Sequence, residues 1–110
     1  MSDEWLKICH KDEVIENRGV CALLDDRQIA LFKVEDQFFA IGNFDPIGKA
    51  EVLSRGITGD LQGEWVVASP LYKQHFSLRT GRCLEEDCAV PSYDTRVEGD
   101  FVWVKRTANQ

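Results

Sequence analysis

Apolar and polar residues alternate with a period of two along most of this chain, which is typical of strands that bury one face. Turn signals interrupt the alternation at intervals of about 8 to 12 residues. We therefore expect strands over residues 28–34, 38–41, 64–68, 75–78, 96–98 and 101–104. The pattern predicts an all-β sandwich or barrel, because no stretch shows the longer period of an extended amphipathic helix.

Short polar segments indicate how these strands are joined. The turn-like residues 35–37 predict a hairpin, and Gly99-Asp100 predicts another near the end of the chain. Residues 11–15 are expected to form one short helical turn. Four glycines punctuate the stretch from Gly48 to Gly63, which we interpret as mostly connection.

Length and composition favour a single domain over residues 1–110. With 44% hydrophobic residues the chain can form a real core, which excludes a disordered protein. No apolar run approaches the roughly 20 residues that a membrane span needs. The start of the chain, Met1-Ser2-Asp3-Glu4, is acidic and lacks the apolar segment of a secretory signal. We therefore expect a cytoplasmic protein.

The formal net charge of −6, from 19 acidic and 13 basic residues, argues against nucleic acid as a partner. Binding to phosphates requires a basic face, which this composition does not favour. The charge is compatible with docking onto a basic patch of another protein, and equally with a role in solubility alone.

The four cysteines do not imply disulfides in a cytosolic chain. Cys9 and Cys21 lie in apolar, strand-like runs and are expected to be small buried hydrophobes. Cys83 and Cys88 are spaced more widely than zinc-knuckle ligands. A structural zinc completed by the two histidines is therefore the less favoured alternative.

Two proline-containing loops carry the most informative pattern. They are residues 43–47, Asn-Phe-Asp-Pro-Ile, and residues 69–72, Ser-Pro-Leu-Tyr. Alone, each loop would indicate an ordinary turn. A Rieske [2Fe–2S] centre places two Cys on one iron and two His on the other, and that family writes these ligands as Cys-x-His and Cys-Pro-x-His. The two loops, in this order and with strand-like sequence between them, match that arrangement in outline.

All four ligands are replaced within the outline. Asp45 and Ser69 stand where the cysteines belong, and Ile47 and Tyr72 stand where the histidines belong. Iron–sulfur clusters prefer soft thiolates, and an isoleucine side chain offers no donor atom. The sequence therefore predicts a degenerate Rieske domain that holds no cluster and no metal.

The whole chain resembles the small subunit of bacterial NADH-dependent nitrite reductase, in the branch that lacks the ligands. The resemblance implies a Rieske-like β-framework with a small inserted loop subdomain at about residues 44–72. It is carried, besides the two loops, by Trp5, 20–24, 29–34, 38–41, 52–56, 65–68, 81–84, 93–97 and 102–104.

This resemblance also implies a function. The family reduces nitrite to ammonium with NADH, in nitrate and nitrite assimilation, and a large subunit carries FAD, an iron–sulfur cluster and sirohaem. The present chain would be a non-catalytic small subunit without cofactors or catalytic residues, because cofactors carry such chemistry. Two alternatives remain open: a Rieske-type electron-transfer ferredoxin, and a free-standing protein-interaction adaptor.

Individual residues admit more than one reading. Asp45 is expected to cap its loop by accepting backbone N–H groups, rather than to be a catalytic carboxylate. Tyr72 is expected to fill the space that a cluster would occupy, with a surface tyrosine as the alternative. His75 is expected to be a hydrogen-bonded structural residue rather than a metal ligand. Residues 79–82 are expected to form a solvated turn, and anion binding is less favoured.

The tips of the two loops are expected to contact the large subunit. They carry Phe44, Ile47, Leu71 and Tyr72, and an apolar cluster at loop tips is typical of an interface. The alternative is that these side chains turn inward and fill the vacant cluster site. The partner-binding role and the filling of the vacant site are compatible if Tyr72 points inward and Ile47 points outward.

Overall fold

The computed structural model describes residues 4–109, within which twelve strands and two short 3₁₀ helices occur. Met1 to Asp3 of the acidic N-terminal segment, on which the absence of a secretory signal was predicted, lie outside the described residues. The elements are β1 Trp5–His10, η1 Lys11–Glu13, β2 Val20–Leu24, β3 Arg27–Val34, β4 Gln37–Gly42, β5 Phe44–Asp45, β6 Ala50–Glu51, η2 Leu53–Arg55, β7 Ile57–Leu61, β8 Glu64–Ala68, β9 His75–Ser77, β10 Ser92–Tyr93, β11 Thr95–Glu98 and β12 Phe101–Lys105.

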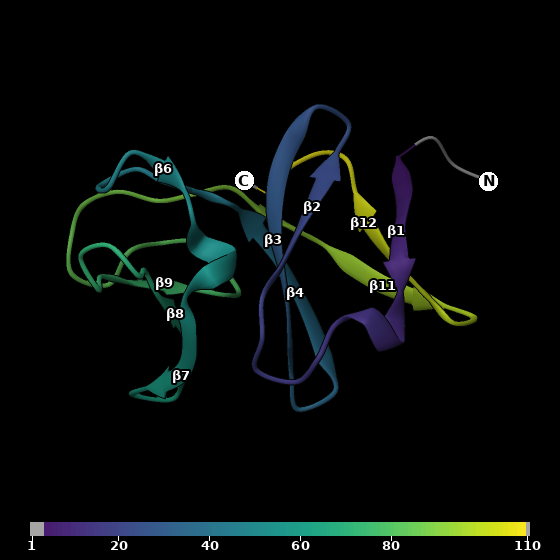
Figure 1. The fold of residues 1–110 in the computed structure, drawn as a ribbon, viewed down its shortest axis with the longest axis horizontal. Helices are drawn as coiled ribbons and strands as arrows, with labels where there is room; N and C mark the ends of the chain where they lie inside the picture. Colours follow the sequence, from purple (N-terminus) through teal and green to yellow (C-terminus); the bar gives the residue numbers. More distant parts are fainter. Residues whose placement is uncertain (1–3, 110) are drawn as a thin grey trace.

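Two antiparallel sheets form the framework, which occupies the centre and right of Figure 1. One has the order β1-β12-β11 and the other the order β10-β4-β3-β2. The predicted β3–β4 hairpin is confirmed, with Glu35 and Asp36 both at positive φ in its turn. The predicted β11–β12 hairpin is also confirmed, around Gly99 with φ of 61°. The all-β prediction is therefore confirmed.

Two smaller sheets, β5-β6 and β7-β8-β9, lie to the left in Figure 1, and we call this part of the molecule the small lobe. An apolar cluster joins this lobe to the framework, because Phe32 and Ile41 of β3 and β4 pack with Val67 and Phe76 of β8 and β9. A second cluster fills the framework between its two sheets. The lobe includes β9, so it extends beyond residue 72, and the limits of 44–72 for an inserted subdomain stay a prediction.

Three further expectations can be compared with the structure. Residues 48–63 were expected to be mostly connection, and this was wrong, because β6, η2 and β7 all lie there. β7 reads Ile-Thr-Gly-Asp-Leu, whose Gly and Asp disfavour a strand, and it is formed through tertiary pairing with β8. Cys21 is exposed on the outer strand β2 and Cys9 is half-buried, so the expectation of buried thiols was wrong for Cys21. The helical turn is confirmed, as η1.

Candidate functional site

Asp45 lies in the first loop, residues 43–49, which we call loop 1, and its side chain is buried. Its Oδ1 accepts the backbone N–H of Ile47 at 2.8 Å and that of Gly48 at 3.0 Å. Its main-chain oxygen accepts the N–H of Lys49 at 2.7 Å. Asp45 therefore caps a tight turn, as predicted, and its two backbone donors hold the carboxylate in one orientation.

The second carboxylate oxygen of Asp45 crosses to the other loop, residues 69–74, which we call loop 2. There the buried Ser69 hydroxyl donates a hydrogen bond to Asp45 Oδ2. Ser69 Oγ also accepts the N–H of Leu71 at 3.3 Å, and its main-chain oxygen accepts that of Lys73 at 3.0 Å. The two positions where a Rieske centre has its cysteines are thus joined to each other directly.

A close apolar contact accompanies this hydrogen bond. Gly48 of loop 1 faces Leu71 of loop 2 so closely that a Cβ on the glycine would lie 2.3 Å from Leu71 Cδ1. The same Cβ would lie 3.1 Å from Asp45 Oδ2. The absence of a side chain at residue 48 therefore allows the loops to approach and the Asp45–Ser69 bond to form.

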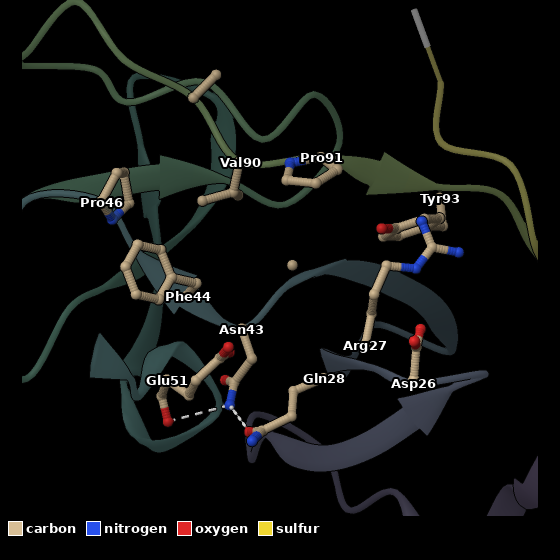
Figure 2. A pocket seen from close by; sticks show the side chains of 12 residues that line it. Asp26, Arg27, Gln28, Asn43, Phe44, Pro46, Glu51, Val90, Pro91 and Tyr93 are labelled. Atoms are coloured by element: carbon tan, nitrogen blue, oxygen red, sulfur yellow. Dashed lines mark hydrogen bonds between the residues drawn. The ribbon is translucent and has the colours of Figure 1, made fainter. Parts of the chain in front are cut away.

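Asn43 anchors loop 1 to the framework, a role that was not predicted from the sequence. Its Oδ1 accepts the N–H of Ser54 at 2.7 Å. Its Nδ2 donates to Gln28 Oε1 at 3.0 Å and to the main-chain oxygen of Glu51 at 3.1 Å, as Figure 2 shows. A buried amide is stable only when its groups are bonded. A polar residue separated from the apolar run 38–41 by Gly42 alone was the available signal.

Tyr72 does not fill the interior, so that expectation was wrong. Its side chain is 65% exposed, while Ile47 is half-buried against the apolar cluster under the lobe. The suggested combination of Tyr72 inward and Ile47 outward is thus reversed. The Asp45–Ser69 bond brings the loops together where the ring was expected to lie. Phe44 and Leu71, each 44% exposed, complete the apolar set at the tip.

His75 begins β9 directly after loop 2 and pairs with Glu85. The carboxylate accepts the His75 backbone N–H at 2.8 Å and lies 2.6 Å from its ring Nδ1. Burial alone would raise the pKa of Glu85, but the hydrogen bonds and charge of His75 outweigh it and leave that pKa below its ordinary value. The prediction that His75 is a hydrogen-bonded structural residue is confirmed. The predicted turn at 79–82 is also confirmed, with Gly81 at a φ of 81°.

These donors do not fit a [2Fe–2S] centre. Asp45 and Ser69 are occupied by each other, Ile47 has no donor, and Tyr72 points to solvent. Across residues 4–109, no three His, Cys, Asp or Glu side chains gather into a group suited to a metal ion. The four positions can position the loops, but they cannot hold two irons between two thiolates and two imidazoles.

Charged side chains and a cavity lie next to the apolar tip of the two loops. Lys49 and Lys73, one on each loop, are exposed, and neither forms an ion pair within the described part of the chain. On the framework side of Phe44 lies an open cavity of about 370 Å³ (Figure 2). Its walls include Pro46, Val90, Pro91 and Tyr93, with the Arg27 guanidinium 5.6 Å from the Tyr93 ring centre.

Comparison with known proteins places this geometry in context. The family described as Rieske-like [2Fe-2S] domain matches residues 4–105. The chain is 46% identical over 105 residues to the nitrite reductase (NADH) small subunit of Escherichia coli K12, covering 93% of this chain and 97% of that one. The NMR structure of the E. coli protein NirD superimposes with a TM-score of 0.84 at 45% identity, covering 92% of this chain and 94% of that one.

A further relative is much longer. The chain is 46% identical over 104 residues to part of the nitrite reductase [NAD(P)H] large subunit of Klebsiella oxytoca. The match covers 94% of this chain and 11% of that protein. A domain of this kind therefore exists both as a short separate chain and as a segment of a large one.

Proposed function

The chain belongs to the Rieske-like [2Fe-2S] domain family, and from this we propose that it is the non-catalytic small subunit of an NADH-dependent nitrite reductase. Its role is to bind the large subunit, which reduces nitrite to ammonium with FAD, an iron–sulfur cluster and sirohaem. The near-complete match to the E. coli small subunit supports this assignment. A cytoplasmic location and nitrite assimilation belong to the same proposal. No helix of residues 4–109 has the length and apolar character to cross a membrane.

We propose further that this chain carries no cluster. The observation behind this is the buried Asp45–Ser69 hydrogen bond, which links the loops that a cluster would otherwise crosslink. In a Rieske protein the ligand bonds fix the tips of both loops. Here a hydrogen bond, two backbone caps and the contact of Gly48 with Leu71 do so.

The partner-binding surface is proposed to be the tip formed by Phe44, Leu71 and Tyr72, with Ile47 supporting it from beneath. These side chains are apolar, and the first three are exposed at one end of the lobe. Lys49 and Lys73, one on each loop, are exposed, and so is Glu51, which pairs with Phe44 across the β5–β6 ladder. The tip therefore suits an apolar patch on the large subunit that is bordered by charged groups of both signs.

One pair of variants tests the surface. Leu71→Asp places a charge in the proposed interface, and Val97→Asp places one on β11, which belongs to the framework to the right of the small lobe in Figure 1. The wild-type side chains are 44% and 42% exposed, which makes them a matched pair. Titration against the purified large subunit should show at least a tenfold weaker affinity for Leu71→Asp, and unchanged affinity for Val97→Asp. Equal binding by both variants would move the docking surface elsewhere.

The electron-transfer alternative is favoured only by the family description, which names a [2Fe–2S] cluster. Purified protein separates the two functions. A non-catalytic subunit is expected to be colourless, folded without metal, and silent in EPR after reduction. A red-brown protein with stoichiometric iron and sulfide and a Rieske-type signal would instead establish a ferredoxin.

A further inference from the structure

Cys83 and Cys88 face each other across a short antiparallel pairing. Arg82 and Ala89 form an antiparallel bridge, and the flanking bonds are Cys83 N–H to Cys88 O at 3.0 Å and Val90 N–H to Gly81 O at 2.8 Å. In this register residues 83 and 88 are directly opposite, so their side chains leave the pairing on the same side. Four residues, 84–87, close the loop between them.

The two thiols share one environment but differ in access. Cys83 is 6% exposed and belongs to the apolar cluster of the small lobe, whereas Cys88 is half-buried and packs against that cluster from outside. Burial raises the pKa of Cys88, and the charge and hydrogen bond of Cys83 and the nearby carboxylates of Glu86 and Asp45 raise it further. The pair therefore lies within electrostatic reach of the Asp45–Ser69 bond.

We propose that Cys83 and Cys88 form a reversible intrachain disulfide when the protein meets a low-molecular-weight disulfide such as glutathione disulfide. Opposite residues of an antiparallel pair have Cβ atoms about 4.5–5.5 Å apart, and a disulfide needs about 3.5–4.5 Å. The required approach is small, and the loop 84–87 consists of exposed bends that can adjust.

The chemistry follows from which thiol is accessible. The Cys88 thiolate attacks one sulfur of glutathione disulfide, forming a mixed disulfide and releasing one glutathione thiolate. The Cys83 thiolate then attacks the Cys88 sulfur, forming the intrachain bond and releasing the second glutathione. The protein loses two electrons and two protons, and the glutathione disulfide gains them. Excess reduced glutathione reverses both steps.

The Cys83–Cys88 disulfide would constrain the segment that lies beside loop 2. Within the loop that it closes, Leu84 donates its N–H to His75 O at 2.9 Å, and Glu85 binds the backbone and ring of His75. His75 directly follows loop 2. The disulfide therefore fixes a segment that supports loop 2, which would make the tip respond to thiol redox state. Any effect on docking rests on the proposed function, whereas formation of the bond does not.

The test incubates the full chain with glutathione disulfide, blocks free thiols by alkylation and maps the peptides by mass spectrometry. In wild-type protein the peptides that contain residues 83 and 88 should be joined by a bond that removes two hydrogen atoms, with neither thiol alkylated. Cys83→Ser should accumulate a stable glutathione adduct on Cys88, because the resolving thiol is missing. Oxidised wild type should also melt several degrees higher than oxidised Cys88→Ser.

Two results would overturn the proposal: a stable glutathione adduct on Cys88 of wild type, or Cys83 and Cys88 both remaining alkylatable after oxidation. The reaction rate should rise roughly tenfold per pH unit between pH 7 and 9, because only the thiolate attacks. A pH-independent rate would contradict the stated chemistry. None of these readouts requires the large subunit, so a failure here leaves the proposed function untouched.

Discussion

The framework and the tip of the small lobe are held together by different forces. The framework cluster between its sheets consists of apolar side chains such as Leu31, Val102 and Val104. The tip instead buries Asn43, Asp45 and Ser69, and each of them is hydrogen-bonded. Apolar packing is non-directional and fills volume, whereas hydrogen bonds fix particular atoms in particular places.

This difference explains how a loop pair shaped for a cluster stays ordered without ligands. Without metal–ligand bonds, apolar contacts such as that of Ile47 with the core would not by themselves fix the orientation of the two loops. A buried carboxylate that accepts two backbone N–H groups and a hydroxyl restores directional links at the same place. Such a link makes the stability of the loops sensitive to substitution, because loss of one partner leaves the other polar groups buried and unpaired.

The largest effect on stability is expected in the framework. Leu31→Ala removes a fully buried side chain between the sheets and should lower the free energy of unfolding by about 4 kcal/mol. Leu23→Ala, on the neighbouring strand β2, removes a side chain that is 62% exposed and should cost less than about 1 kcal/mol. Urea denaturation of both variants measures the difference, and equal costs would contradict the assigned core.

Asp45→Ala should come next, at about 3 kcal/mol, because the Ser69 hydroxyl and two backbone N–H groups lose their acceptor. Asp60→Ala is the matched control. Its exposed carboxylate also accepts a backbone N–H, from Gly63 at 3.0 Å, so it should cost less than about 1 kcal/mol. If the two variants unfold at the same urea concentration, the Asp45–Ser69 bond does not hold the tip.

Gly48→Ala should have a smaller effect on stability, about 1 kcal/mol, because the new methyl group displaces Leu71. Gly59→Ala is the control, since a Cβ there meets no atom within 4 Å. Thermal melts followed by circular dichroism compare the pair. A Gly48→Ala protein as stable as Gly59→Ala would mean that the loops tolerate separation at this contact.

The smallest expected effect is a change in how the free energy of unfolding depends on pH. The pKa of Glu85 is lowered in the fold by its hydrogen bonds with His75, which outweigh the opposing effect of burial. Its contribution to stability is therefore present above the ordinary glutamate pKa of about 4.3 and is lost as the pH falls through the lowered folded value. Wild type should lose more stability than Glu85→Gln between pH 5 and pH 3. Parallel curves for the two proteins would argue against the His75–Glu85 link.

Local pattern in the sequence was sufficient for six of the twelve strands and for the hairpin turns. The period of two located β3, β4, β8, β9, β11 and β12, because alternating side chains must face either the core or solvent. The Asp-Pro and Ser-Pro dipeptides located both loops. β7 was not predicted, since its residues have little strand preference and the element depends on its partner β8.

The sequence by itself determined the fold class and the positions of the two loops. It also determined that the cysteine and histidine ligands of a Rieske centre are replaced, by Asp45, Ile47, Ser69 and Tyr72. Only the tertiary structure decided that Asp45 and Ser69, 24 residues apart, meet in a buried hydrogen bond. It also decided that Tyr72 faces solvent and Ile47 faces the core. The reason is physical: side-chain type follows from the sequence, but the neighbour that satisfies a buried polar group depends on how distant segments pack.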